Sequence, residues 1–213
     1  MIIDPRKQSY QDNYKLMIGS IIPRPIAFIS TRSPEGIANL APYSFFSGVT
    51  SNPPTICFAP SRKSPDGSKK DTLINIEATG EFVVNMVSTA FVRQMNETAM
   101  DFPYEVSEFA EAGLTEASAG LVKAPRVAES KINLECRLMQ IVEIGPAEPG
   151  GGFLVIGEII LFHIADEIIN NGRIDSSLLD PVGRLGGLEY CRLGERFALP
   201  RKPYQAKDKS ARE

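Results

Sequence analysis

Short apolar runs separated by turn residues dominate residues 21–60. Residues 24–31 alternate between two faces, which is the period of a β-strand. The turn sequence Ser-Pro-Glu-Gly follows at 33–36, so we expect 24–31 to form a hairpin with residues 37–41. Residues 54–59 come after an Asn-Pro-Pro entry and predict a further strand.

The segment Ala-Pro-Tyr-Ser at 41–44 interrupts this β pattern. Pro42 has no N–H group and cannot donate a hydrogen bond to a neighbouring strand. We therefore expect 41–44 to be an irregular piece at a sheet edge or barrel rim, and not part of a regular central strand.

The helix signals are fewer. Residues 1–20 predict a short helix or a lead-in segment. A helix is expected to begin at residue 71 or 72 and to end at Gly80, followed by a strand at 81–87. Ser88 or Thr89 is expected to cap a second helix that runs to residue 100, and 101–125 reads as loops with one short helix.

The most regular strand pattern lies at residues 130–165. Apolar residues at 132, 134, 136 and 138 alternate with Asn, Glu, Arg and Met, which predicts a strand with one face in water. A Gly- and Pro-rich turn at 145–152 and a return strand at 153–165 complete a large antiparallel hairpin. With a turn at 170–172, about six or seven strands predict a mainly β fold with a few helices, as a closed or partly closed antiparallel barrel.

The composition is that of an ordinary globular chain, with 213 residues, 43% hydrophobic and 23% charged. We expect a single domain over residues 1–200. Residues 201–213 hold five Lys or Arg and two acids, which predicts a basic C-terminal tail or arm.

Charge and targeting signals narrow the function. The net charge of −3 argues against a nucleic-acid partner. The N-terminus lacks a secretory signal pattern, and the longest apolar tract, 153–165, is broken by Glu158 and is too short to span a bilayer. We therefore expect a cytoplasmic protein with no membrane partner.

Several common catalytic motifs are missing. There is no GxGxxG, Walker, HExxH or GxSxG motif, and His163 is the only histidine. Cys57, Cys136 and Cys191 have no CxxC spacing and read as reduced thiols, so no metal site is expected. These absences argue against a Rossmann enzyme, a hydrolase and a metalloenzyme.

The junction between the loop at 61–70 and the next helix is the most informative polar cluster. Ser61, Arg62, Lys70, Asp71 and Thr72 offer hydroxyls, cations and a helix N-terminus, the groups that bind phosphate. The alternative is a solvated basic loop before an ordinary Asp-capped helix. The Asp71 carboxylate would compete with phosphate unless it pairs with Lys70 or Arg62.

A second set of polar residues lies on the first hairpin. Ser30-Thr31 and 39–44 could form a flat polar lining for the edge of a heteroaromatic ring. Aromatic residues such as Tyr43, Phe45 and Phe46 are more often core residues than cofactor contacts. Spacing alone does not decide between these interpretations.

The order of these fragments resembles the flavin reductase-like family of FMN-binding split β-barrels, which also includes flavoredoxin. The likeness covers roughly residues 15–200. The fragments that carry it are Arg-Pro-Ile-Ala-Phe-Ile-Ser-Thr at 24–31, Asn-Leu-Ala-Pro-Tyr-Ser-Phe-Phe at 39–46, Asn-Pro-Pro-Thr at 52–55, Ser-Arg at 61–62, Lys-Asp-Thr at 70–72, Gly-Glu-Phe-Val-Val-Asn at 80–85, Ile-Gly-Glu at 156–158 and Gly-Arg-Leu-Gly-Gly at 183–187 with Tyr190.

The resemblance implies an antiparallel Greek-key split barrel that forms a homodimer, with one FMN per subunit at or near the interface. It also implies three groups of cofactor-binding residues. Those for the phosphate are Ser61, Arg62, Lys70, Asp71 and Thr72; those for the ribityl chain and isoalloxazine are Thr31, Asn39, Ala41, Tyr43 and Ser44; those that close the site, from the same or the other subunit, are Arg184, Gly186 and Tyr190.

The implied activity is hydride transfer from NADH or NADPH to N5 of FMN, without a dedicated nicotinamide-binding domain. No catalytic side chain is expected, because hydride arrival at N5 requires no protein proton. The backbone N–H groups of 39–44, except Pro42, and the Arg24 or Arg184 side chain are candidate donors to the reduced flavin. His163 is either a strand residue bonded locally or a contact of the flavin or nicotinamide.

Two alternatives remain open. One is a flavoredoxin-like FMN electron carrier that is reduced by a protein partner. The other is a non-enzymatic FMN-binding module. A redox partner protein or an oxygenase is a possible recipient of the electrons.

Overall fold

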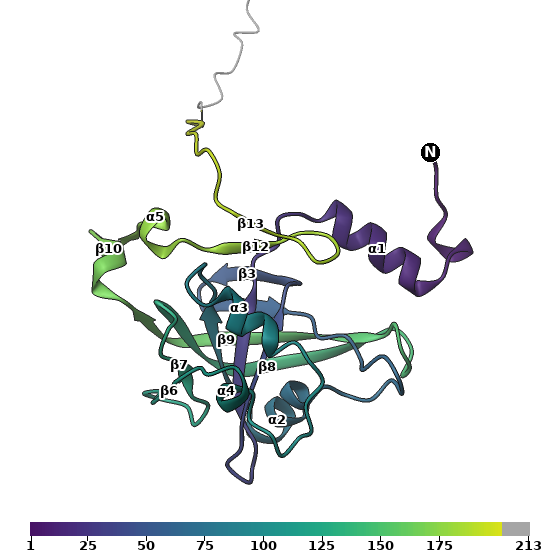
Figure 1. The fold of residues 1–213 in the computed structure, drawn as a ribbon, viewed down its shortest axis with the longest axis horizontal. Coiled ribbons are helices and arrows are strands. Elements are labelled where there is room, and N and C mark those ends of the chain that lie inside the picture. Colours follow the sequence, from purple (N-terminus) through teal and green to yellow (C-terminus); the bar gives the residue numbers. More distant parts are fainter. Residues whose placement is uncertain (202–213) are drawn as a thin grey trace, which may run out of the picture.

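The chain is described by a computed structural model for residues 1–201 (Figure 1). Apart from Arg201, the expected basic tail lies outside the described residues. Within residues 1–201, no helix combines the length and apolarity needed to cross a membrane.

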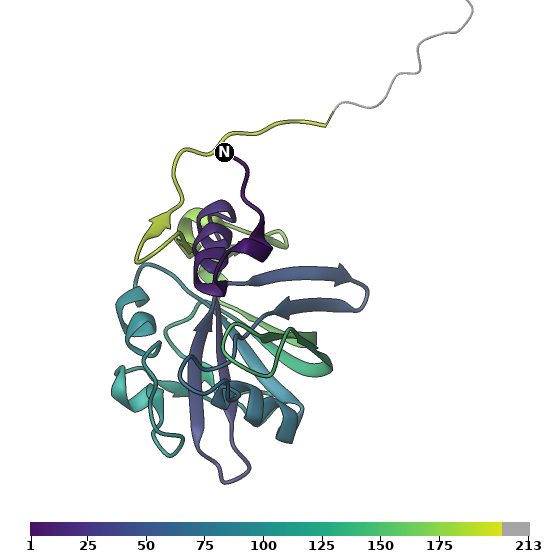
Figure 2. The ribbon, with the colours of Figure 1, turned by 90° about the vertical axis from the view of Figure 1, so that its right-hand side faces the viewer.

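A seven-stranded antiparallel sheet forms the centre of the molecule, with strand order β2-β1-β5-β8-β9-β4-β3. The β3–β4 hairpin extends away from the rest of the sheet, as Figure 2 shows. The bounds of these strands are Ala27–Arg32 (β1), Ala38–Tyr43 (β2), Phe46–Ser51 (β3), Pro54–Phe58 (β4), Glu81–Met86 (β5), Ile132–Ile144 (β8) and Gly152–Ile164 (β9).

The remaining elements are short, apart from the first two α-helices. The helices are η1 (Pro5–Lys7), α1 (Tyr10–Ser20), α2 (Asp71–Thr79), α3 (Val92–Glu97), α4 (Glu108–Glu111), η2 (Asp166–Ile168) and α5 (Ser176–Leu179). Three two-stranded ribbons pair β6 (Glu116–Ala117) with β7 (Arg126–Val127), β10 (Ile169–Asn170) with β11 (Arg173–Ile174), and β12 (Val182–Arg184) with β13 (Tyr190–Arg192).

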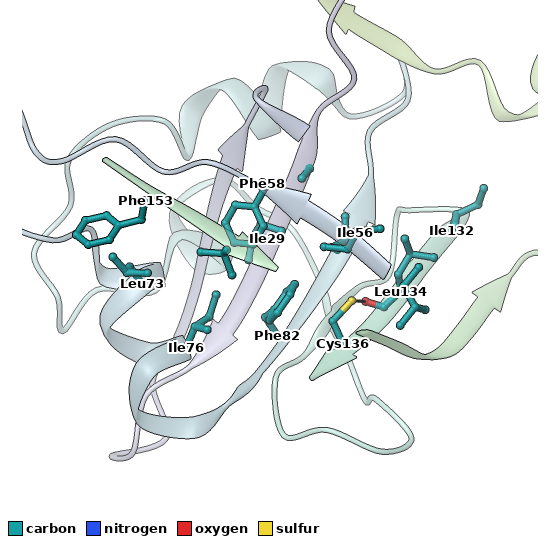
Figure 3. Packing of buried hydrophobic residues seen from close by; sticks show 14 of the residues in the cluster. Ile29, Ile56, Phe58, Leu73, Ile76, Phe82, Ile132, Leu134, Cys136 and Phe153 are labelled. Atoms are coloured by element: carbon teal, nitrogen blue, oxygen red, sulfur yellow. Dashed lines mark hydrogen bonds between the residues drawn. The ribbon is translucent and has the colours of Figure 1, made fainter. Parts of the chain in front are cut away.

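The main core lies between the curved sheet and α2 (Figure 3). Leu73 and Ile76 on α2 are buried and belong to the same cluster as Phe58 and Phe82, whose ring centroids are 5.6 Å apart. Helix α2 begins at Asp71 and ends before Gly80, which has φ 69°. The start and the left-handed glycine stop expected from the sequence are confirmed.

The helix expected from residue 88 or 89 to residue 100 is shorter than predicted, and α3 covers only Val92–Glu97. Ser88 forms a β-bridge with Pro181, and the Thr89 N–H donates to the Asp180 carbonyl at 3.1 Å. These two residues therefore continue β pairing instead of capping a helix.

Strand β2 runs regularly through Pro42, which pairs with Phe28, so the expected irregular segment is wrong. Its expected position at a sheet edge is right, because β2 is the first strand of the sheet. N–H groups alternate sides along an antiparallel strand, and the Leu40 N–H points outward to Glu108. Pro42 shares that orientation, so its missing N–H removes no bond to β1.

The sequence predicts that one face of β8 is exposed to water, and this prediction is wrong for the first half of the strand. Asn133 and Glu135 are 2% and 0% exposed. Segment 115–131 covers this face, and both side chains bond to it: Asn133 donates to the Val127 carbonyl at 3.2 Å, and Glu135 accepts from Gly120 at 2.6 Å. Alternating polar side chains indicate a solvent-exposed strand face only if no other segment of the chain covers that face.

Candidate functional site

A pocket of about 100 Å³ lies where β2 meets the start of α2. Segment 98–102 and α4 close its other sides. Six residues that the family resemblance assigns to the cofactor line this pocket: Asn39, Ala41, Tyr43, Lys70, Asp71 and Thr72. Two segments that lie about thirty residues apart in the chain are thus brought together.

The N-terminus of α2 faces this pocket without a side-chain cap. Lys70 occupies the N-cap position and makes no capping bond. The N–H groups of Asp71 and Thr72 belong to the first turn and have no carbonyl partner within the helix. Two backbone donors and the positive end of the helix dipole are therefore available to an anion.

Two lysines and two aspartates surround these donors. Lys63 Nζ donates to Asp71 Oδ1 at 3.0 Å, and Lys70 Nζ donates to Asp101 Oδ1 at 3.1 Å. Asp71 therefore pairs with a cation, but the partner is Lys63 and neither Lys70 nor Arg62. Both lysine side chains are partly exposed and both residues line the pocket, where a phosphate could recruit them.

A chain of buried hydrogen bonds lies beneath the pocket and runs in one direction. Tyr104 donates to Asn75 Oδ1 at 2.8 Å, Asn75 Nδ2 donates to Thr31 Oγ1 at 3.0 Å, and Asn39 Nδ2 donates to Glu108 Oε1 at 2.6 Å. Thr31 and Asn39 are linked at 3.4 Å. The carboxylate of Glu108 thus fixes the orientation of the Asn39 amide.

Thr72 is part of this arrangement. Its hydroxyl donates to Asn39 Oδ1 at 2.8 Å, so its oxygen lone pairs remain available toward Tyr43 and the pocket. The side chain of Thr72 is therefore better placed to accept a hydrogen bond from a ligand hydroxyl than to donate one to a phosphate.

Burial shifts the pKa values of two groups at the pocket. Burial is the main cause that raises the pKa of Tyr43 above its usual range; the Thr72 hydroxyl opposes this effect, while Glu108 and Asp71 add to it. Burial also raises the pKa of Glu108. Hydrogen bonds from backbone N–H groups and from Asn39 favour the charged form and partly offset this effect. Tyr43 therefore remains a neutral phenol at physiological pH.

The backbone of β2 contributes less than the sequence predicts. Because the Leu40 N–H points outward, alternation directs the N–H groups of Asn39, Ala41 and Tyr43 inward to β1. These three groups are therefore occupied by the sheet and are not free donors to a flavin. Strand β2 presents side chains to the pocket instead.

Thr31 does not line the pocket. It is fully buried on β1 and supports the pocket through Asn75 and Asn39. Its role is to hold the polar network and not to touch a ligand.

Ser44 and Gly186 lie outside this pocket, Ser44 against Arg24 and Gly186 beside Ile18 and Gly19 at the end of α1. Arg24 is 3% exposed; its Nε donates to Ser44 Oγ at 3.2 Å and its Nη2 donates to the Leu185 carbonyl at 2.8 Å. Its Nη1 donates to the carbonyls of Ile18 and Ile21 at 2.6 and 2.7 Å. Arg24 therefore fastens α1 to the sheet, and the expectation of a free donor to flavin is wrong for this residue.

Arg184 and Tyr190 pair with each other on the β12–β13 ribbon. The Arg184 guanidinium carbon lies 4.4 Å from the centre of the Tyr190 ring, and Arg184 Nη2 donates to the Gly187 carbonyl at 2.6 Å. The Tyr190 hydroxyl donates to Asn96 Oδ1 at 2.8 Å. The structure therefore does not bring these two residues into the pocket at α2.

Ser61 and Arg62 also lie outside the pocket lining. Ser61 is exposed and forms a β-bridge with Gly152. Arg62 packs over the Phe153 ring at 4.7 Å and pairs with Glu143. Of the five residues expected at the phosphate, three line the pocket and two contact the β8–β9 hairpin.

Sequence reasoning missed Lys63 and Glu108 as pocket residues. Lys63 lies in the basic loop, and its separation of eight residues from Asp71 gives no periodic signal. Glu108 reaches Asn39 across 69 residues of sequence. Only the packing of α4 on β2 reveals that contact.

Known proteins with similar sequences and structures agree on one fold. A family model described as a flavin reductase like domain matches residues 18–182. Component B of nitrilotriacetate monooxygenase from Bacillus cereus is 41% identical, with a TM-score of 0.89, and the match covers 93% of this chain and 98% of that chain. The 2-nitrobenzoate 2-nitroreductase of Pseudomonas fluorescens is 31% identical, with a TM-score of 0.86, over 98% of this chain and 100% of that chain.

A protein with a split barrel domain from Shewanella frigidimarina is 24% identical, with a TM-score of 0.80, over 95% of this chain and 100% of that chain. At that identity the likeness is one of fold alone. The mainly β, antiparallel split barrel expected from the sequence is therefore confirmed.

Proposed function

Because the chain belongs to the flavin reductase-like family, we propose that it binds FMN and transfers a hydride from NADH or NADPH to it. When bound, FMN would supply the redox chemistry, as acceptor of the hydride and donor of electrons. The protein binds and orients the cofactor.

One observation carries this proposal. Residues of β2 and of the start of α2, which the family resemblance assigns to a single cofactor, line one pocket in the folded chain. That pocket contains an uncapped helix N-terminus and two lysines, the donor set that a phosphate requires.

The donor set fits the phosphate end of FMN. The N–H groups of Asp71 and Thr72 and the ammonium groups of Lys63 and Lys70 would hold the phosphate, with Asp71 neutralised by Lys63. The lone pairs of Thr72 would accept from a ribityl hydroxyl. Tyr43, kept neutral by burial, would present an uncharged face to the chain that joins phosphate and ring.

The pocket is too small for the whole cofactor. Its volume of about 100 Å³ compares with roughly 300 Å³ or more for a pocket that encloses a drug-sized ligand. We therefore propose that the ring lies outside it and is covered by a second subunit, which would supply Arg184, Gly186 and Tyr190. The proposed homodimer completes the site.

The proposed acceptor of the reduced flavin is an oxygenase. The Bacillus cereus relative is component B of a monooxygenase, which favours a two-component arrangement over a self-contained enzyme. A flavoredoxin-like carrier and a non-enzymatic binding module remain alternative outcomes of the experiments below.

Titration of FMN fluorescence against the purified protein tests the pocket. Lys70→Gln removes a cation from the pocket lining, and we expect the Kd for FMN to rise about tenfold, the low end for one charge-assisted bond at a partly exposed site. Lys69→Gln is the matched control, because Lys69 carries the same charge but bonds to Glu77 at 2.6 Å. Equal effects of both substitutions would place the phosphate elsewhere.

Stopped-flow reduction tests the activity. Rapid bleaching of bound FMN by NADH or NADPH is expected for a reductase. Bleaching by dithionite alone would favour the electron carrier, and failure of the wild-type protein to bind FMN at all would refute every flavin-based function.

A further inference from the structure

An apolar groove of about 360 Å³ lies between the β12–β13 ribbon and the segment that leads into β1. It shares no lining residue with the pocket at α2, and its lining contains no carboxylate. Of its two charged residues, Arg24 is buried and Arg192 is exposed. Most of the lining is apolar and includes Pro23, Pro25, Ile26, Met86, Val87 and Val182.

The segment after β13 begins at this groove and then leaves the body of the protein, as Figures 1 and 2 both show. Gly194 belongs to the groove lining, and we call residues 194–201 the exposed arm. They form no helix or strand, and within residues 1–201 their backbone groups make no hydrogen bond. The side chains of Phe197 and Leu199 are 80% and 81% exposed. The arm therefore has two large apolar side chains and an unpaired backbone that its own subunit does not cover.

The arm does not fill the groove of its own subunit. Arg196 Nη1 donates to Ser176 Oγ at 2.8 Å, which holds the middle of the arm against the start of α5. Ser176 is not part of the groove lining, and neither are Phe197 and Leu199. The groove and the apolar part of the arm are thus both unoccupied surfaces of one chain.

We propose that two copies of the chain exchange their exposed arms, with Phe197 and Leu199 of each copy in the apolar groove of the other. In an extended chain, residues two positions apart lie on the same side, so both side chains can enter one groove. Because the arm begins at its own groove, arm and groove belong to a single surface. A two-fold interface requires such a self-complementary surface, and the exchange closes with two copies.

The charges beside the groove agree with this arrangement. Glu195 would lie on the same side of an extended arm as Phe197. Within residues 1–201, neither Glu195 nor Arg192 makes an ion pair. Exchange would bring Glu195 close to Arg192 of the partner subunit at the groove, which would help to fix the register of the arm.

This inference rests on the homodimer proposed above and specifies how its subunits are held together. The β12–β13 ribbon, which carries Arg184 and Tyr190, lines the groove through Gly183 and continues into the arm. An arm seated in the groove would therefore fasten the ribbon at the subunit interface, where the proposed flavin site needs it.

Cys191 lines the groove and serves as a native probe for cross-linking. In a Cys57→Ser background, Phe197→Cys adds a thiol to the arm, while the remaining Cys136 is buried, which raises its pKa and keeps it unreactive. We expect a mild oxidant to join the new thiol to Cys191 of the other copy and to give a covalent dimer on a denaturing gel without reductant. Cys191→Ser in the same protein should abolish this product.

Leu121→Cys in the Cys57→Ser background is the matched control. Leu121 is 53% exposed and does not line the groove, so this variant should remain a monomer on the same gel.

Sedimentation equilibrium of the full-length protein gives a second, independent measurement. Phe197→Asp should raise the dissociation constant of the dimer tenfold or more, because it removes an apolar side chain that the exchange would bury. The ring is 80% exposed within one subunit, so the variant should fold normally. Leu121→Asp should leave the dissociation constant unchanged.

Three results would overturn the arm exchange. These are a disulfide that forms within one chain, a dimer whose dissociation constant Phe197→Asp does not change, and a wild-type protein that is a monomer. A cross-linked dimer that binds no FMN would instead refute the proposed function and leave the arm exchange standing. An FMN-binding dimer that Phe197→Asp does not weaken would refute the arm exchange alone.

Discussion

The carboxylate of Glu135 offers the sharpest test of the energetics of this fold. Each of its oxygens accepts two bonds: Oε1 from the Gly120 N–H and His163, and Oε2 from the N–H groups of Leu121 and Val122 at 2.6 and 3.1 Å. Glu135→Gln preserves the shape but replaces one oxygen by an NH₂ group. Two N–H donors that bond to the buried carboxylate then face a donor.

The expected loss of stability follows from this change. An unsatisfied donor costs about 1–3 kcal/mol where it is fully buried, so two part-buried donors cost at most roughly 2–6 kcal/mol. Removal of a fully buried charge offsets part of that cost. We therefore expect the free energy of unfolding to fall by about 3 kcal/mol at pH 7, a large share of the roughly 5–15 kcal/mol typical of a folded domain.

The lowered pKa of Glu135 also predicts how the stability difference between wild type and variant changes with pH. The folded protein lowers the pKa of Glu135, so its stabilisation is present above the unfolded value near 4.3 and is lost as the pH falls through the folded pKa. The difference between wild type and Glu135→Gln should therefore be largest near neutral pH and shrink below about pH 4.

Urea unfolding at pH 7 and pH 3.5 measures both effects. Glu148→Gln, an exposed change on the tip of the β8–β9 hairpin, is the control and should alter stability by no more than about 0.5 kcal/mol. Amide hydrogen exchange of residues 120–122 should quicken selectively in Glu135→Gln. A loss below about 1 kcal/mol at pH 7, or a loss that does not change with pH, would refute the reasoning.

Three further predictions concern packing. Gly67→Ala should destabilise the basic loop by more than about 1 kcal/mol in urea unfolding, because Gly67 has φ 73° and an added Cβ would lie 2.6 Å from Glu148 Cα. Phe82→Ala should cost about 3–5 kcal/mol by the same measurement, as its ring is fully buried beside Phe58. Burial raises the pKa of the Cys136 thiol, so Cys136 should react with a thiol reagent only after unfolding, whereas half-buried Cys57 and Cys191 react first.

The sequence predicts well those features that depend on neighbouring residues. The stop of α2 at Gly80 and the β8–β9 hairpin follow from glycine conformation and two-residue periodicity, both of which are local. The edge position of β2 follows from a single proline. The family resemblance predicts that residues of β2 and of the start of α2 bind the same cofactor. Periodicity alone does not predict this.

The features that the sequence does not predict depend on contacts between residues that are distant in the chain. Glu108 meets Asn39, and Glu135 meets Gly120, only after separate segments pack against the sheet. The same holds for Arg62, whose position in a phosphate-binding pattern does not reveal that it packs on Phe153. Charge and spacing identify a candidate, while tertiary packing decides which way its side chain points.

Arg24 also bears on how freely the sequence of this protein can vary. Three of its four partners are backbone carbonyls, those of Ile18, Ile21 and Leu185, and only Ser44 contributes a side chain. A carbonyl is present whatever the residue type, so the partners in and just after α1 and after β12 can be replaced without removing these bonds. Tolerance to substitution should therefore be high at those positions and low at Arg24 itself, an asymmetry that a saturation mutagenesis map would display as one invariant site among permissive neighbours.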